Sequence, residues 1–218
     1  MGIVYENAEP ARFLGTCFAF RDSMYFLTAR HCVGTLRAEQ VGIELPSVNT
    51  SHSVRAIVPH PTADLAVLIL NGDAPDIDTF RFFGVHALGQ DFMAYGFPED
   101  VFGETPPRPT ERLFRGYIQR YMVFRSPEGY VYDALELSIG APAGLSGGPL
   151  FQAHQPWLII GIVTADLKST TFLQSEETME EPGRFHKTST ATYINYGVAL
   201  QLEKQAAFLE QHIPAPKT

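Results

Sequence analysis

The sequence predicts an all-β fold of many short strands with one helix at the C-terminal end. Short runs rich in β-branched and aromatic residues recur along most of the chain, and turn residues separate them. The 18 glycines and 16 prolines suit such turns. With 218 residues, 45% of them hydrophobic, the chain can bury a sizeable core as one large β unit or as two small lobes.

Five candidate strands lie in the first half of the chain. They cover residues 13–20, 24–28, 41–45, 54–58 and 65–70. The tripeptide Arg21-Asp22-Ser23 is expected to join the first two strands as a hairpin turn. Turn residues dominate positions 71–76, so we expect the first lobe to span residues 1–75.

Six further candidate strands lie in the second half, at residues 91–95, 113–124, 130–138, 149–152, 157–164 and 193–200. We expect them to form a second lobe over residues 76–200, within a single domain. Leu202, Ala206 and Leu209 recur at helical spacing before Pro214, which predicts a C-terminal helix over residues 201–213. The polar stretch 167–192 is expected to be a long loop, either a lid or partner-sensing element or a solvated insertion.

The composition argues against several classes of partner. The formal net charge is −8, and nucleic-acid binding normally draws on a basic face, so we expect no nucleic-acid partner. No run of 18 apolar residues exists, so we expect no membrane span. The histidines are scattered without metal-ligand spacing, so we expect no metal site.

The N-terminal residues lack the charged and apolar regions of a secretory signal. We therefore expect a cytoplasmic protein, or a secreted one if a leader is missing from the sequence. Residues 213–218 are compatible with the start of a linker in a longer chain.

The segment Gly144-Leu145-Ser146-Gly147-Gly148-Pro149 is the strongest functional signal. Glycines permit a sharp turn at which the Ser146 hydroxyl and nearby backbone N–H groups can face a substrate carbonyl. A serine hydroxyl is a weak nucleophile at neutral pH, so it needs an adjacent base such as an imidazole. Taken alone, the segment is explained equally well as a flexible turn.

Two further motifs supply such a base and a carboxylate. Thr28-Ala29-Arg30-His31-Cys32 follows a predicted strand, and Asp64 precedes an apolar run. Alone, His31 would be read as a structural histidine and Asp64 as the start of a buried strand. Together, the order His31, Asp64, Ser146 and the motifs around these residues resemble the chymotrypsin/trypsin-like serine peptidases, in particular their compact bacterial members.

The resemblance implies two six-stranded antiparallel β-barrels with the active site in the cleft between them. His31 and Asp64 would come from the first barrel and Ser146 from the second. Ser146 would attack the acyl carbon, His31 would carry the proton, and Asp64 would orient His31. The backbone N–H groups of Gly144 and Ser146 would form the oxyanion hole.

The resemblance also places a substrate pocket around Gly140, Gly197 and the segment Thr164-Ala165-Asp166. Thr164 would hydrogen-bond Asp64 through its hydroxyl. Gly140 stands where the related trypsins carry an anchor for Arg or Lys, which favours a small or aliphatic side chain before the scissile bond. Asp166 is either a partner for a basic substrate residue at the pocket mouth or a solvated loop carboxylate. The strand that leads to Asp166 either flanks the substrate or is an interior strand without substrate contact.

Cys17 and Cys32 flank the histidine motif, as the cysteines of a disulfide do in many related enzymes. They form either that disulfide or two buried free thiols, and we expect them to be close in space in both cases. Leu145 replaces the aspartate that pairs with a new N-terminus in digestive relatives. This departure resembles members whose site forms without cleavage, or is ordered by a partner or loop.

These observations predict a serine endopeptidase that acts on protein or peptide substrates and needs no cofactor. Choosing peptidase over esterase rests on the resemblance. One alternative is a binding module that keeps the barrels but has lost turnover. The other is a latent protease domain of a larger protein, controlled by a regulatory partner or by additional domains.

Overall fold

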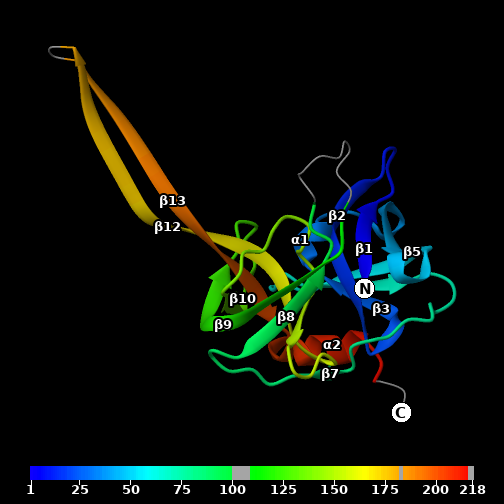
Figure 1. Ribbon diagram of the computed structural model, residues 1–218. Coiled ribbons are helices and arrows are strands. Elements are labelled where there is room, and N and C mark those ends of the chain that lie inside the picture. Colours follow the sequence, from blue (N-terminus) through cyan, green and yellow to red (C-terminus); the bar gives the residue numbers. More distant parts are fainter. Residues whose placement is uncertain (100–108, 182–183, 216–218) are drawn as a thin grey trace.

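Two β-barrels account for most of the structure, a computed structural model that describes residues 1–99, 109–181 and 184–215 (Figure 1). The strands of the first barrel are β1 (Gly2–Glu6), β2 (Arg12–Phe20), β3 (Asp22–Thr28), β4 (Val41–Leu45), β5 (Thr50–Pro59) and β6 (Ala66–Leu70). Antiparallel pairing in the order β1-β2-β3-β6-β5-β4 closes this barrel around buried Val4, Phe26 and Ile43.

The five strands predicted in the first half are confirmed, but β1 was not predicted. It is only five residues long, yet it pairs with both β2 and β4 and thereby closes the barrel. The turn between β2 and β3 is also tighter than expected. It consists of Arg21 alone, which has a positive φ of 64°.

The second barrel contains β8 (Asp91–Gly96), β9 (Arg112–Arg125), β10 (Val131–Leu137), β11 (Pro149–Gln152), β12 (Leu158–Glu181) and β13 (Arg184–Gln201). These strands follow the order β11-β8-β9-β10-β13-β12, and pairing of β11 with β12 completes the ring. The short strand β7 (Phe82–Phe83) adds to β12 in parallel. The expected all-β, double-barrel architecture is therefore confirmed.

An apolar cluster joins the two barrels and the C-terminal helix. It combines Phe18 and Leu65 of the first barrel region with Ile159 and Leu200 of the second, and Leu209 of the helix, all buried. The helical elements are α1 (Arg30–Val33), the 3₁₀ turns η1 (Ala38–Gln40), η2 (Pro46–Val48) and η3 (Leu202–Gln205), and α2 (Ala206–His212). The predicted C-terminal helix thus begins as a 3₁₀ turn. Among the described residues, no helix is long and apolar enough to cross a membrane.

Strands β12 and β13 continue beyond the barrel as a two-stranded arm (Figure 1). Their antiparallel pairing runs from Asp166 opposite Gly197 to Glu181 opposite Arg184. The expectation of a loop over residues 167–192 is therefore wrong. The sequence contains signals for the arm, because the stretch is rich in threonine and has the turn dipeptide Pro182-Gly183 near its middle.

Candidate active site

His31 and Asp64 lie at the same end of the first barrel. His31 is the second residue of α1, just after the end of β3, and Asp64 precedes β6, the neighbour of β3. The Asp64 side chain is only 2% exposed, whereas that of His31 is 29% exposed. Arg30 ties the two segments together, because its guanidinium donates a hydrogen bond of 2.6 Å to the His60 carbonyl.

Asp64 binds His31 through both of its carboxylate oxygens. Oδ2 accepts a hydrogen bond from His31 Nδ1 over 2.7 Å, and Oδ1 accepts one from the His31 backbone N–H over 2.9 Å. This pairing favours the tautomer that is protonated at Nδ1 and leaves Nε2 as the basic nitrogen. Nε2 lies 3.8 Å from Cys32 Sγ.

The environment raises the pKa of His31 above its ordinary value of 6.5. Burial lowers this pKa, but the hydrogen bonds to Asp64 and Cys32 and the charges of these groups outweigh the effect of burial. The protonated imidazole is therefore favoured in the folded protein. A base at Nε2 becomes available only as the pH rises through this raised pKa.

The pH dependence of activity is expected to reflect this shift. Only neutral His31 can accept a proton, so kcat/KM should rise with pH through a midpoint above 6.5. Initial rates at low substrate concentration between about pH 5 and 11 give the profile. In Asp64→Asn the pKa of His31, followed by NMR titration of its imidazole, should be lower, because the variant lacks the carboxylate that favours the imidazolium. A wild-type midpoint at or below 6.5 would contradict the assignment of His31, with its raised pKa, as the base.

Ser146 lies between β10 and β11, at a turn that depends on glycines. Gly144 and Gly147 have φ values of 87° and 84°, which favour glycine. A Cβ at Gly144 would also lie 2.6 Å from the carbonyl oxygen of Phe97. The side chain of Leu145 is fully buried and anchors the turn in the second barrel. The predicted sharp, glycine-flanked serine turn is therefore present in the fold.

The Ser146 turn contacts the first barrel directly. The Ser146 carbonyl accepts a hydrogen bond of 2.9 Å from the Thr16 N–H, and the Cys32 thiol lies 3.7 Å from the same oxygen. Cys32 Sγ also lies 3.8 Å from His31 Nε2, so this thiol contacts both the imidazole and the Ser146 carbonyl. Within the described residues, no hydrogen bond joins the Ser146 hydroxyl to His31. Such bonds are often long in free enzymes and tighten when substrate binds.

The backbone around the predicted oxyanion hole is held by Thr16. Its Oγ1 donates to the Gly144 carbonyl over 2.8 Å and accepts from the Phe97 N–H over 3.0 Å. In the part of the chain that the structure describes, the N–H groups of Gly144 and Ser146 donate to no backbone acceptor. The sequence analysis missed Thr16, whose only signal is a hydroxyl in an otherwise apolar strand.

The expected hydrogen bond from Thr164 to Asp64 is not formed. Thr164 Oγ1 donates to the Val198 carbonyl over 3.2 Å and accepts from the Tyr132 hydroxyl over 3.0 Å. Thr164 and Asp64 nevertheless line the same cavity. Tyr132, which the sequence analysis also missed, is buried in the apolar cluster that joins the two barrels and supports this strand through its hydroxyl.

The other predicted substrate-binding residues come together beside this cavity. Asp166 lies opposite Gly197 in the β12–β13 pairing, and Ala165 lies opposite Val198. A Cβ at Gly140 would lie 3.4 Å from Asp166 Oδ1. The cavity has a volume of about 490 Å³. It is lined by His31, Asp64, Phe124 to Glu128, and Thr164 to Leu167. A substrate chain could therefore pass from Asp166 to His31.

Cys17 and Cys32 are free, buried thiols in the structure, so the disulfide alternative is not formed. Burial raises the pKa of the Cys17 thiol, and the neighbouring Cys32 adds to this effect. This influence of Cys32 on Cys17 agrees with the expectation that the two thiols lie near each other.

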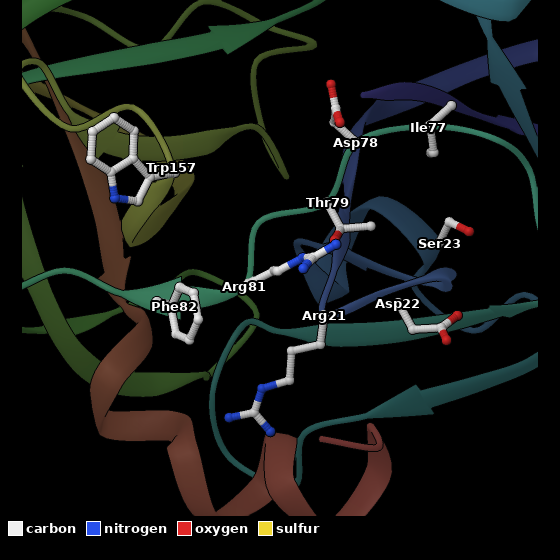
Figure 2. Close-up of a pocket in the computed structure, with 9 residues that line it drawn as sticks. All are labelled: Arg21, Asp22, Ser23, Ile77, Asp78, Thr79, Arg81, Phe82 and Trp157. Carbon is white, nitrogen blue, oxygen red and sulfur yellow. The ribbon is translucent and has the colours of Figure 1, made fainter. Parts of the chain in front are cut away.

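A second cavity, of about 470 Å³, lies at the end of β3 that is distant from His31 (Figure 2). Figure 2 shows Phe82 and Trp157 on one side of it and Asp78 on the other, with Arg81 between them. None of the predicted site residues lines this cavity. It is therefore separate from the site between the barrels.

Two barrels with a histidine–carboxylate pair on one and a glycine-flanked serine on the other define the architecture of the double-barrel peptidases. The family described as the trypsin-like peptidase domain matches residues 15–162, which is more than half of the chain. The chain belongs to this family of chymotrypsin/trypsin-like serine peptidases. No curated protein sequence gives a match.

Solved structures of proteases share the fold at low sequence identity. The HtrA-type protease AlgW with a tripeptide is 19% identical, with a TM-score of 0.67 over 98% of this chain and 60% of its own. The active form of the Rv3671c protease from M. tuberculosis is 17% identical, with a TM-score of 0.65 over 99% of this chain and 81% of its own. AlgW with a decapeptide has a TM-score of 0.63 and 19% identity over 92% of this chain. The chain spans only about half, 52%, of that AlgW chain.

Proposed function

We propose that the protein is a serine endopeptidase that hydrolyses protein or peptide substrates through an acyl-enzyme on Ser146. The observation that carries this proposal is the Asp64–His31 pair of the first barrel, joined by a hydrogen bond of 2.7 Å and adjoining the Ser146 turn of the second. A base, its orienting carboxylate and a hydroxyl are the groups that acyl transfer requires.

In the first half of the reaction, Ser146 Oγ bonds to the substrate carbonyl carbon while its proton passes to His31 Nε2. The carbon–nitrogen bond then breaks, and His31 gives the proton to the leaving amine. In the second half, a water molecule repeats these steps on the ester and releases Ser146. Asp64 stays ionised throughout and stabilises the imidazolium that forms twice in each cycle.

The oxyanion that forms in both halves requires hydrogen-bond donors at a fixed position. The Gly144 and Ser146 N–H groups are suited to this role because neither donates to a backbone acceptor among the described residues. Thr16 holds the Gly144 carbonyl through a hydrogen bond of 2.8 Å, which restricts rotation of the Gly144–Leu145 peptide unit between the two donors. Donors that are fixed before substrate arrives need no reorganisation during the reaction.

A fluorophosphonate probe tests the proposal directly, because it forms a covalent bond only with an activated serine. The wild-type protein is expected to become labelled at Ser146, and Ser146→Ala should abolish the labelling. Ser23→Ala is the matched control, since Ser23 lines the distant cavity, and it should be labelled like the wild type. Intact-mass measurement after incubation gives the labelled fraction.

Absence of labelling in the folded wild-type protein would contradict the proposal. That outcome would favour the binding module that has lost turnover. Labelling that persists in Ser146→Ala would assign the reactive hydroxyl to another residue and would equally overturn the role of Ser146.

A further inference from the structure

We propose that the Asp166 carboxylate makes this site select arginine or lysine immediately before the scissile bond. The inference rests on the proposed function and specifies its substrate class. It develops the sequence-based alternative in which Asp166 meets a basic substrate residue, and it departs from the preference for small or aliphatic residues that Gly140 suggested.

Asp166 belongs to the strand that borders the cavity at the His31–Asp64 pair. It follows Thr164 and Ala165 along β12, and all three residues line that cavity. Asp166 is half-buried and lies opposite Gly197, which has no side chain to cover it. Asp166 is therefore part of the pocket wall and not the solvated loop carboxylate of the alternative interpretation.

The carboxylate occupies the space that a side chain at Gly140 would enter. A Cβ at Gly140 would lie 3.4 Å from Asp166 Oδ1 and 3.2 Å from Asn195 Cβ. The carboxylate is fixed there, because Oδ1 accepts a hydrogen bond of 3.0 Å from the Ala141 N–H. Gly140 has no charged side chain, and the Asp166 carboxylate of β12 places a negative charge beside it.

Asp166 has no cationic partner within the described residues. The Ala141 N–H is the single hydrogen-bond donor that it receives there, and no Lys, Arg or His lies at ion-pair distance. A carboxylate can accept about four hydrogen bonds, so Oδ2 remains able to bind a guanidinium or an ammonium. A half-buried carboxylate without a counter-ion favours a ligand that brings one.

The other charges of the cavity balance one another, so its net charge is the negative charge of Asp166. Asp64 pairs with His31, and Glu128 is offset by Arg125, the one arginine or lysine of the lining. Hydrogen bonding to Ser126 lowers the pKa of Glu128, so its carboxyl is ionised at neutral pH. An acidic substrate residue would therefore be repelled, and a basic one attracted.

Two peptide substrates that differ only in charge test the selection. One carries arginine before the scissile bond and the other carries citrulline, which has nearly the same shape but no charge. The wild-type protein is expected to give a kcat/KM at least about tenfold higher for arginine, in line with a charge-assisted hydrogen bond. In Asp166→Asn this ratio should fall to about one third or less of the wild-type value, while the Asn Oδ1 can still accept the Ala141 N–H.

Asp133→Asn is the matched control, because Asp133 is an exposed carboxylate of the same barrel that does not line the cavity. It should keep the wild-type ratio. Equal cleavage of the two substrates by the wild type, or an unchanged ratio in Asp166→Asn, would overturn the proposal.

A binding measurement separates this proposal from the proposed function. Ser146→Ala cannot form an acyl-enzyme, yet its pocket should still bind p-aminobenzamidine, a cationic aromatic amidine whose fluorescence rises on binding. Adding Asp166→Asn should weaken this binding at least about tenfold. No binding to Ser146→Ala, together with normal fluorophosphonate labelling of the wild type, would overturn the selectivity and leave the peptidase activity standing.

Discussion

Asp64→Asn is expected to lower kcat by about 10⁴ while the protein remains folded. The asparagine amide would donate a hydrogen bond to His31 Nδ1, whereas the carboxylate accepts one there over 2.7 Å. The imidazole would then carry its proton on Nε2, and it could no longer take the proton of Ser146. Steady-state rates with a peptide substrate measure the loss.

The conservative change keeps the other contact of this residue. The Asn oxygen can still accept the His31 backbone N–H that now donates to Asp64 Oδ1 over 2.9 Å. A loss of activity is therefore not a loss of the local fold, and thermal unfolding verifies this. Asp76→Asn, at an exposed turn, should leave kcat unchanged. A fall in kcat of less than about tenfold in Asp64→Asn would contradict its orienting role.

Gly147→Ala is expected to lower the free energy of unfolding by about 4 kcal/mol, a value reserved for severe steric or backbone conflicts. The new Cβ would lie 2.0 Å from the Thr16 carbonyl oxygen and 2.4 Å from Thr28 Oγ1. These atoms belong to β2 and β3 of the first barrel, so they cannot withdraw without disturbing the contact between the barrels. Urea unfolding monitored by fluorescence measures the difference.

Gly72→Ala is the matched control, because it measures the cost of a positive φ for alanine without the steric clash. Gly72 has the same φ of 84°, but nothing lies within 4 Å of the position that a Cβ would take. The free energy of unfolding of this variant should fall by only about 1–2 kcal/mol, the cost of an alanine in the left-handed conformation. Equal losses in the two variants would show that the contact between Gly147 and the first barrel contributes nothing.

The sequence alone allowed us to propose the reactive groups because each lies in a short local motif. His31 follows a strand, Asp64 precedes one, and Ser146 is flanked by glycines that the turn requires. The barrel strands were predictable for a similar reason, since alternating apolar residues reveal a strand with one buried face. The order of the three motifs then indicated how the barrels are arranged.

The supporting residues could not be predicted, because they act through contacts between distant parts of the chain. Thr16 holds Gly144, which lies 128 residues away, and Tyr132 holds Thr164, which lies 32 residues away. A single hydroxyl in an apolar strand gives no indication of its partner. Thr164 illustrates the same limit, since its hydroxyl bonds to the adjacent strand and not to Asp64.

The arm was taken for a loop because its sequence shows no regular alternation of apolar and polar residues. The length of the polar stretch then favoured a loop. Its pairing depends on register between β12 and β13, and the composition of either strand alone does not reveal that register.

The apolar cluster that contains Phe18, Leu200 and Leu209 holds the two barrels together. In the proposed mechanism, His31 and Asp64 come from the first barrel and Ser146 from the second, so a chain whose barrels were folded but separated would have no peptidase activity. Titrating active sites with a covalent reagent therefore also counts the molecules whose two barrels are correctly assembled. A defect in assembly would lower the number of active sites but leave kcat per active site unchanged.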